Sequence, residues 1–102
     1  MRTLTTELLR TTIRGERAVA EVPVIPDDAP PALREGLRRR RVAAGLGRCP
    51  CGATRHITPA IWAALCQSDP DRPTGHAPFN HTADCPAHAE RLGPEIEHWQ
   101  GK

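Results

Sequence analysis

The chain has 102 residues, of which 38% are hydrophobic, and it contains 11 Pro, 8 Gly, two Trp, one Phe and no Tyr. This composition suits one small domain with a thin core, a class that commonly depends on a metal ion or on disulfides for its stability. No apolar run is long enough to span a bilayer, and the first residues lack the apolar stretch of a signal peptide, so we expect a cytoplasmic protein with reduced thiols. The formal net charge of +2 hides a basic middle, because residues 33–48 hold six arginines and one acid.

Residues 1–28 form the first predicted unit, an extended segment with one edge strand. The apolar pattern favours a helix or extended piece up to about Thr12, followed by a strand near residues 17–25. Two short strands joined around Gly15 are the alternative. Because Pro23 has no N–H to donate, we expect the strand to lie at the edge of a sheet.

Residues 29–102 form the second predicted unit, a helical and zinc-stabilised part of what we expect to be a single domain. In its first helix Asp28 is the cap, Pro30 or Pro31 lies in the first turn, and Gly45 or Gly47 marks the end. The second helix begins with Thr58 as cap and Pro59 in its first turn. A proline-rich loop over residues 68–80 follows.

The third predicted helix begins near Asp84 and carries Leu92, Ile96 and Trp99 on one side. Gly93 and Pro94 should break or bend this helix. The fold class that these elements predict is a small α+β domain with an N-terminal strand segment, three short helices and long Pro-rich loops.

Two short motifs, each with two potential metal ligands, predict a single zinc site. Cys49 and Cys51 lie in C-P-C-G, where Gly52 can adopt the positive φ of a tight turn around thiolates. His81 and Cys85 are four residues apart, which places both on one face at the start of a helix. Two such pairs supply the four N and S ligands of a tetrahedral Zn²⁺. They resemble zinc-finger ligand pairs, and a treble-clef arrangement is the closest known shape.

Two other residues are alternative ligands. Cys66 lies among apolar residues and is typical of a buried core position, but an iron–sulfur cluster with a redox-sensing role would recruit it. His88 follows Cys85 by about one helical turn and could replace His81. Four protein ligands leave no open position for water, and no catalytic motif accompanies the cysteines, so we expect a structural zinc and no enzymatic activity.

The basic middle of the chain predicts the binding surface. Its guanidinium groups could bind phosphate oxygens and guanine edges, which favours nucleic acid as the partner and a role related to transcription. The alternative is an adaptor or inhibitor, bacterial or from a phage, that docks on an acidic protein surface. The predicted contact residues are Arg34, Arg38, Arg39, Arg40, Arg41 and Arg48.

Overall fold

A β-hairpin forms the N-terminal part of the computed structural model, which describes residues 2–69, 73–75 and 78–101. Strand β1 (Thr6–Ile13) pairs antiparallel with β2 (Glu16–Pro23), and Thr6 lies opposite Pro23. The two residues of the turn, Arg14 and Gly15, have φ of 54° and 77°. A two-residue turn with both φ values positive matches the twist of the flanking strands. The hairpin alternative is therefore correct, and a helix before Thr12 is wrong.

The sheet gains a third strand from the proline-rich loop. Strand β3 (Thr74–Gly75) runs parallel to β2, and the strand order is β1-β2-β3. The prediction that Pro23 marks an edge strand is thus wrong, because β2 is the central strand. Pro23 is tolerated there since it is the last residue of β2, beyond the short stretch that β3 covers. Residues 70–72 and 76–77 of the predicted loop lie outside the described residues.

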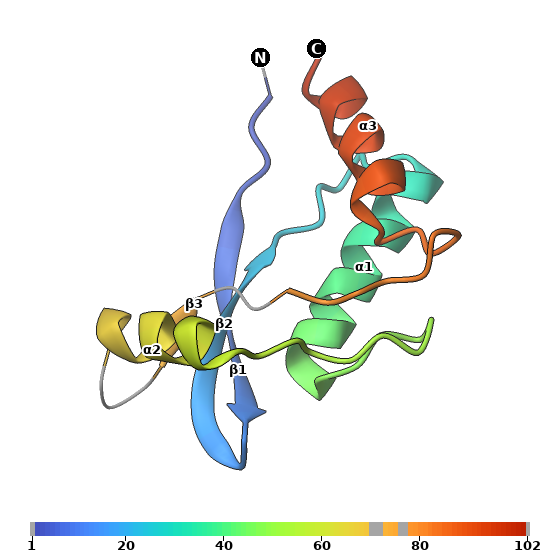
Figure 1. The fold of residues 1–102 in the computed structure, drawn as a ribbon. Helices are drawn as coiled ribbons and strands as arrows, with labels where there is room; N and C mark the ends of the chain where they lie inside the picture. Colours follow the sequence, from blue (N-terminus) through green and yellow to red (C-terminus); the bar gives the residue numbers. More distant parts are fainter. Residues whose placement is uncertain (1, 70–72, 76–77, 102) are drawn as a thin grey trace.

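Helix α1 (Pro31–Leu46) packs across both strands of the hairpin and against α3 (Figure 1). Its buried face carries Leu33, Gly36, Leu37 and Ala43. Gly36 permits the closest approach, because a Cβ there would lie 2.5 Å from the Pro86 oxygen and 2.6 Å from Leu92 Cδ1. The hairpin of the N-terminal unit and the helices of the second unit thus share packing surfaces.

The predicted cap of α1 is wrong, whereas its predicted start and end are confirmed. Pro31 is the first helical residue, and Gly47 ends the helix with a φ of 82°. Asp28 lies further back and instead forms an ion pair with Arg2 and accepts a hydrogen bond from Trp99 Nε1 at 3.2 Å. The carboxylate therefore ties the N-terminal segment to the last helix.

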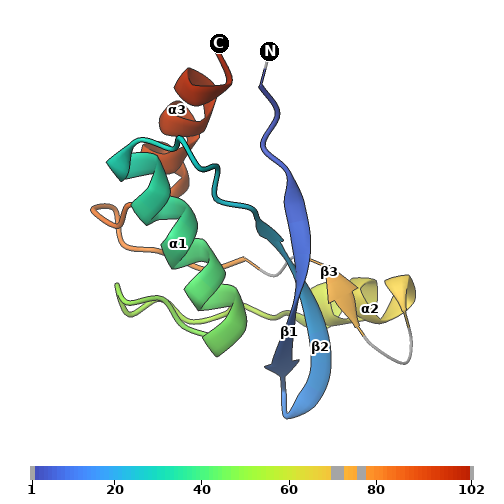
Figure 2. The ribbon, with the colours of Figure 1, turned by 180° about the vertical axis from the view of Figure 1, so that it is seen from behind.

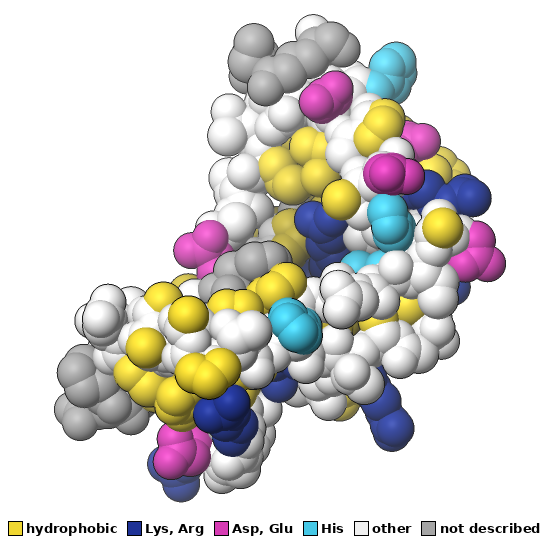
Figure 3. All heavy atoms as spheres, viewed as in Figure 1, with side chains coloured by type: hydrophobic (Ala, Val, Ile, Leu, Met, Phe, Trp, Pro, Cys, Tyr) yellow, Lys and Arg dark blue, Asp and Glu magenta, His cyan; other side chains and the backbone are white. Residues whose placement is uncertain are grey.

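Helix α2 (Pro59–Ser68) lies at the opposite end of the molecule from the chain termini (Figures 1 and 2). The Thr58 side chain caps it by accepting from the Ile61 N–H at 3.2 Å, as predicted. Leu65 is its one buried residue, packed with Ile13 and Ala18 of the hairpin. The outer face of α2 leaves apolar side chains exposed to solvent (Figure 3).

Helix α3 (Ala89–Gln100) begins later than the sequence predicts and continues through Pro94. Pro86 and two turns occupy the residues before it, and His88 caps the helix by accepting from the Glu90 N–H at 3.1 Å. The predicted apolar side is confirmed, since Leu92 is buried and Ile96 and Trp99 pack beside it. No helix in the described ranges has the length and apolarity that a bilayer crossing needs.

Candidate metal centre

The first pair of cysteines lies on a tight turn just after α1. The Cys49 N–H donates to the Ala53 oxygen at 2.8 Å, and the Gly52 N–H donates back to the Cys49 oxygen at 2.9 Å. Gly52 has a φ of 98°, which a side-chain-bearing residue adopts only with strain. The turn brings the buried Cys49 thiol and the half-buried Cys51 thiol to one side of the chain.

The second pair lies on the loop that leads into α3. The Cys85 N–H donates to the Thr82 oxygen at 3.0 Å, so this loop also closes as a turn. His81 precedes the turn, and its ring stacks on Phe79 with the centroids 5.9 Å apart. Packing against Phe79 fixes the orientation of the imidazole. The helix expected at Asp84 is therefore replaced by a turn that holds the same two side chains together.

The structure brings all four predicted ligands into one group, with their ligand atoms within 4.8 Å of one another. Cys49 Sγ lies 3.7 Å from Cys85 Sγ. His81 Nδ1 lies 3.6 Å from Cys51 Sγ and 3.8 Å from Cys85 Sγ. A tetrahedron with Zn–S of about 2.3 Å and Zn–N of about 2.05 Å has edges of about 3.8 Å between two sulfurs and about 3.6 Å between sulfur and nitrogen. These separations suit one small ion.

The thiols differ in how readily they ionise before a metal binds. Burial raises the pKa of the Cys49 thiol to about 11. Burial acts in the same direction on Cys51, but hydrogen bonds from the backbone of Thr82 and Ala53 and from His81 outweigh it and lower its pKa to about 5. Because metal binding requires thiolates, an ion that enters must displace the Cys49 proton.

Hydrogen-bond donors surround the Cys85 sulfur. The Ala87 N–H donates to Cys85 Sγ at 3.4 Å, and Arg39 Nη1 approaches the same sulfur at 3.8 Å. One divalent ion with three thiolates carries a net charge of −1, so a guanidinium at the sulfur offsets that charge. Arg39 thus belongs to the metal centre as much as to the surface of α1.

The two alternative ligands lie outside this group. Cys66 is a half-buried free thiol on α2. His88 uses Nδ1 as the cap of α3. The arrangement that an iron–sulfur cluster would need, with Cys66 beside the other three cysteines, is not what the described residues form.

The six predicted contact arginines have very different surroundings. Arg34, Arg38 and Arg48 are exposed, whereas Arg39, Arg40 and Arg41 are half-buried. Arg38 and Arg39 share the Glu35 carboxylate, and their hydrogen bonds lower the pKa of Glu35 to about 2. Arg34 also donates to the Asp27 oxygen at 2.9 Å, so five of the six predicted contact arginines, all but Arg48, make side-chain contacts within the protein.

The half-buried arginines bind other parts of the chain. Arg40 Nε donates to the Ala87 oxygen at 3.1 Å. Arg41 pairs with Glu7 at 2.6 Å and donates to the Pro23 oxygen at 2.8 Å. These contacts join α1 to the metal-binding loop on one side and to the hairpin on the other.

Sequence reasoning missed Arg55, which ties the first ligand turn to the rest of the fold. Its guanidinium donates to the Ala44 oxygen at 2.6 Å and to the Thr12 oxygen at 3.0 Å, and it lies over the Phe79 ring with Cζ 5.6 Å from the centroid. A lone arginine in a polar loop carries no signal that would have identified this role.

The fold and the four ligands define a small α+β protein with a Cys₃His cluster that can bind a metal ion. Comparisons with protein-family models, with curated proteins and with solved structures found no match for this chain.

Proposed function

We propose that the protein is a non-enzymatic binding module whose fold is closed by one structural Zn²⁺ ion. The observation that carries this proposal is the match between three of the distances within the Cys₃His group and the edges of a zinc tetrahedron, with all four ligand atoms within 4.8 Å of one another. Four protein ligands complete the coordination, which favours a structural over a catalytic ion. The site links the end of α1 to the loop before α3, so the ion would hold these elements together.

Metal analysis of two cysteine variants tests the zinc site. We expect one zinc per chain by native mass spectrometry and elemental analysis, lost in Cys85→Ser and kept in Cys66→Ser, the matched control outside the cluster. Replacement by Co²⁺ should give the intense visible bands of a tetrahedral thiolate site. A brown, iron-containing protein that loses its colour in Cys66→Ser would overturn the proposal in favour of redox sensing.

The treble-clef arrangement stays a prediction. A ligand-bearing turn and a later helix are both present, and Cys85 lies shortly before α3 rather than in its first turn. The segment between the two ligand pairs also contains α2 and β3. We therefore propose only that the two ligand turns play the part that such turns play in zinc fingers.

We propose nucleic acid as the binding partner, with an acidic protein surface as the alternative. The support is the concentration of arginines over residues 33–48 and the exposure of three of them, Arg34, Arg38 and Arg48. Exposed guanidinium groups can bind phosphate without breaking the internal contacts of the half-buried ones. A role related to transcription would follow from such contacts.

A salt titration separates the two partners. We expect a labelled DNA duplex to bind by fluorescence anisotropy, with an affinity that falls steeply as salt rises. The triple variant Arg34→Gln, Arg38→Gln, Arg48→Gln should reduce the salt slope by about 0.9 for each lost phosphate contact. The matched control is Arg10→Gln with Arg17→Gln, two exposed arginines of the hairpin. An equal loss of affinity in both variants would contradict nucleic-acid binding. So would the absence of duplex binding at about 50–100 mM salt, where phosphate contacts are strong.

A further inference from the structure

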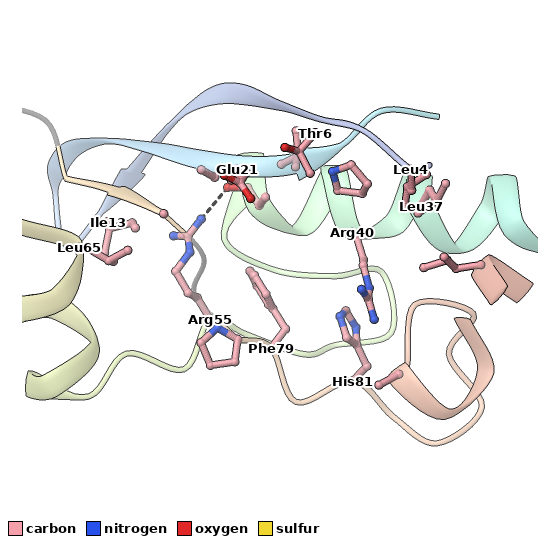
Figure 4. Close-up of a pocket in the computed structure, with 18 residues that line it drawn as sticks. Leu4, Thr6, Ile13, Glu21, Leu37, Arg40, Arg55, Leu65, Phe79 and His81 are labelled. Carbon is pink, nitrogen blue, oxygen red and sulfur yellow. Dashed lines mark hydrogen bonds between the residues drawn. The ribbon is translucent and has the colours of Figure 1, made fainter. Parts of the chain in front are cut away.

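A second feature, separate from the ligand atoms, is a cavity of about 430 Å³ between the hairpin, α1 and the Phe79–His81 segment (Figure 4). Apolar side chains from distant parts of the chain line much of it, among them the half-buried Leu4, Phe79 and Ile96. The space-filling view shows the hollow between α3 and the sheet, with basic atoms inside it beside hydrophobic ones (Figure 3). This volume is in the range of pockets that hold small organic molecules.

Arg40 brings a positive charge into this apolar cavity. Its Nε donates to the Ala87 oxygen, and its side chain extends from α1 across the cavity toward His81 (Figure 4). No carboxylate of the described chain forms an ion pair with it. The terminal nitrogens of a guanidinium carry four N–H donors, which together can bind both oxygens of one carboxylate. The cavity therefore combines an apolar wall with a cation whose terminal N–H groups can bind a ligand.

The negative group that acts on Arg40 is the Cys85 thiolate, which Arg39 contacts directly at 3.8 Å. Arg39 contacts the Cys85 sulfur and shares Glu35 with Arg38, so the single negative charge of a metal–trithiolate group already has a cation beside it. Arg55, on the other side of Phe79, donates hydrogen bonds to the backbone oxygens of Thr12 and Ala44. A half-buried charge of this kind is stabilised by an anion that enters the same low-dielectric space.

Among the described residues, Glu21 is the one acid that lines the cavity, and it opposes an incoming anion. Its side chain is exposed, and within the described residues it pairs with neither arginine. Water can therefore screen its charge far better than that of Arg40. Glu21 should reduce the affinity for an anion without preventing binding.

We propose that this cavity binds a small amphipathic carboxylate, with the carboxylate on Arg40 and the apolar body against the half-buried Leu4, Phe79 and Ile96. The ligand would meet the ring of His81, whose Nδ1 faces the metal centre. Filling the cavity would thus bury apolar surface and pair the charge in one step. Metal binding would support the site, because the ion holds the His81 wall in place.

Three eight-carbon probes test this proposal on the metal-loaded, full-length protein. Isothermal titration calorimetry should detect binding of octanoate, and octan-1-ol and octylamine should bind at least about tenfold more weakly, the factor for one charge-assisted contact of about 1.4 kcal/mol. Amide NMR shifts should map to residues around the cavity. Equal binding of octanoate and octan-1-ol would overturn the proposal, because it would show an apolar void with no role for the charge.

Variants assign the charge to Arg40. Arg40→Met should lower the octanoate affinity about tenfold or more and bring it close to that of octan-1-ol, whereas Arg40→Lys should keep part of the preference. Arg17→Met, at an exposed arginine near the hairpin turn that does not line the cavity, is the matched control and should bind octanoate as the unchanged protein does. Glu21→Gln should bind octanoate more tightly. Each variant is compared at full metal content and with an unchanged amide spectrum, and an unaltered octanoate preference in Arg40→Met would refute the proposal.

Discussion

Arg39 is the residue that connects the basic helix to the metal centre. Its Nε donates to Glu35 at 2.9 Å, while its Nη1 approaches Cys85 Sγ at 3.8 Å. A carboxylate, a guanidinium and a metal-binding sulfur in line orient one another, as in other metal sites with an outer shell of hydrogen bonds. We therefore expect Arg39 to influence metal affinity more than its position on a solvated helix would indicate.

The first prediction concerns this contact. Arg39→Met should weaken zinc binding by about 10-fold, at the lower end of the usual effect of an outer-shell partner, because the contact is long. Arg38→Met is the matched control, since Arg38 shares Glu35 but donates to no sulfur. Competition with a chelating dye at neutral pH measures both affinities. Equal losses in the two variants would mean that Glu35, and not the sulfur contact, matters.

The second prediction concerns two glycines, one in a close packing contact and one with open space around it. Gly36→Ala should lower the free energy of unfolding by about 1–3 kcal/mol, because its Cβ would overlap the Pro86 oxygen. Gly93→Ala should raise it by up to about 1 kcal/mol, since Gly93 lies within α3, has open space around it and lowers helix propensity. Urea unfolding of the metal-loaded protein measures both. A neutral Gly36→Ala would show that α1 and the metal loop can separate at no cost.

At the scale of elements, the sequence predicted best where a local chemical signal was strong. Thr58 followed by Pro59 and Gly47 at a helix end are such signals, and α2 starts and α1 ends at these residues. Cys49, Cys51, His81 and Cys85 were also predictable, because thiols and imidazoles beside turn residues serve few other purposes.

Other elements depend on contacts distant in sequence, and the sequence alone did not predict them. β3 has only two residues, and it is a strand through its parallel pairing with Val19 and Ala20 of β2. Arg40 and Arg41 belong to a run that resembles a solvated surface, yet the packing of α1 against the hairpin and the metal loop half-buries them. Such roles follow from the tertiary arrangement, which overrides local pattern.

The third prediction concerns α3, which continues through a proline. Pro94 has no N–H for the preceding turn and its ring crowds the carbonyl four residues back, so the helix forms despite a local penalty. Pro94 is exposed, and its replacement leaves no cavity. Pro94→Ala should therefore raise the free energy of unfolding by about 1–3 kcal/mol, measured in urea. A loss of stability instead would indicate that the proline ring makes packing contacts that α3 needs.

At the scale of the whole molecule, the buried residues form separate small clusters instead of one large hydrophobic core. One contains the ligand thiols with Ala43 and Ala87, a second joins α1 to α3, and a third joins the hairpin to α2. None of them is large, as expected for a chain with few aromatic residues. The metal cluster lies where α1, the two ligand turns and the start of α3 meet.

The fourth prediction follows from that position. Removal of the metal by a strong chelator should abolish the cooperative thermal transition or lower its midpoint by more than about 15 °C, which corresponds to a loss of several kcal/mol for a domain of this size. Circular dichroism with and without chelator measures the change, and added zinc should restore the transition. A chelated protein that melts as before would contradict a structural role for the ion.

The order of the ligands along the chain gives the ion one further property. Cys51 and His81 belong to different turns, so a bound ion would close the chain between them into a ring that contains α2 and β3. A covalent cross-link that closes a ring of roughly 30 residues restricts the unfolded chain by about 3.5 kcal/mol in the chain-entropy model. An ion provides the same restriction in reversible form, so the supply of metal would set how stable the fold of the α2 end of the molecule is.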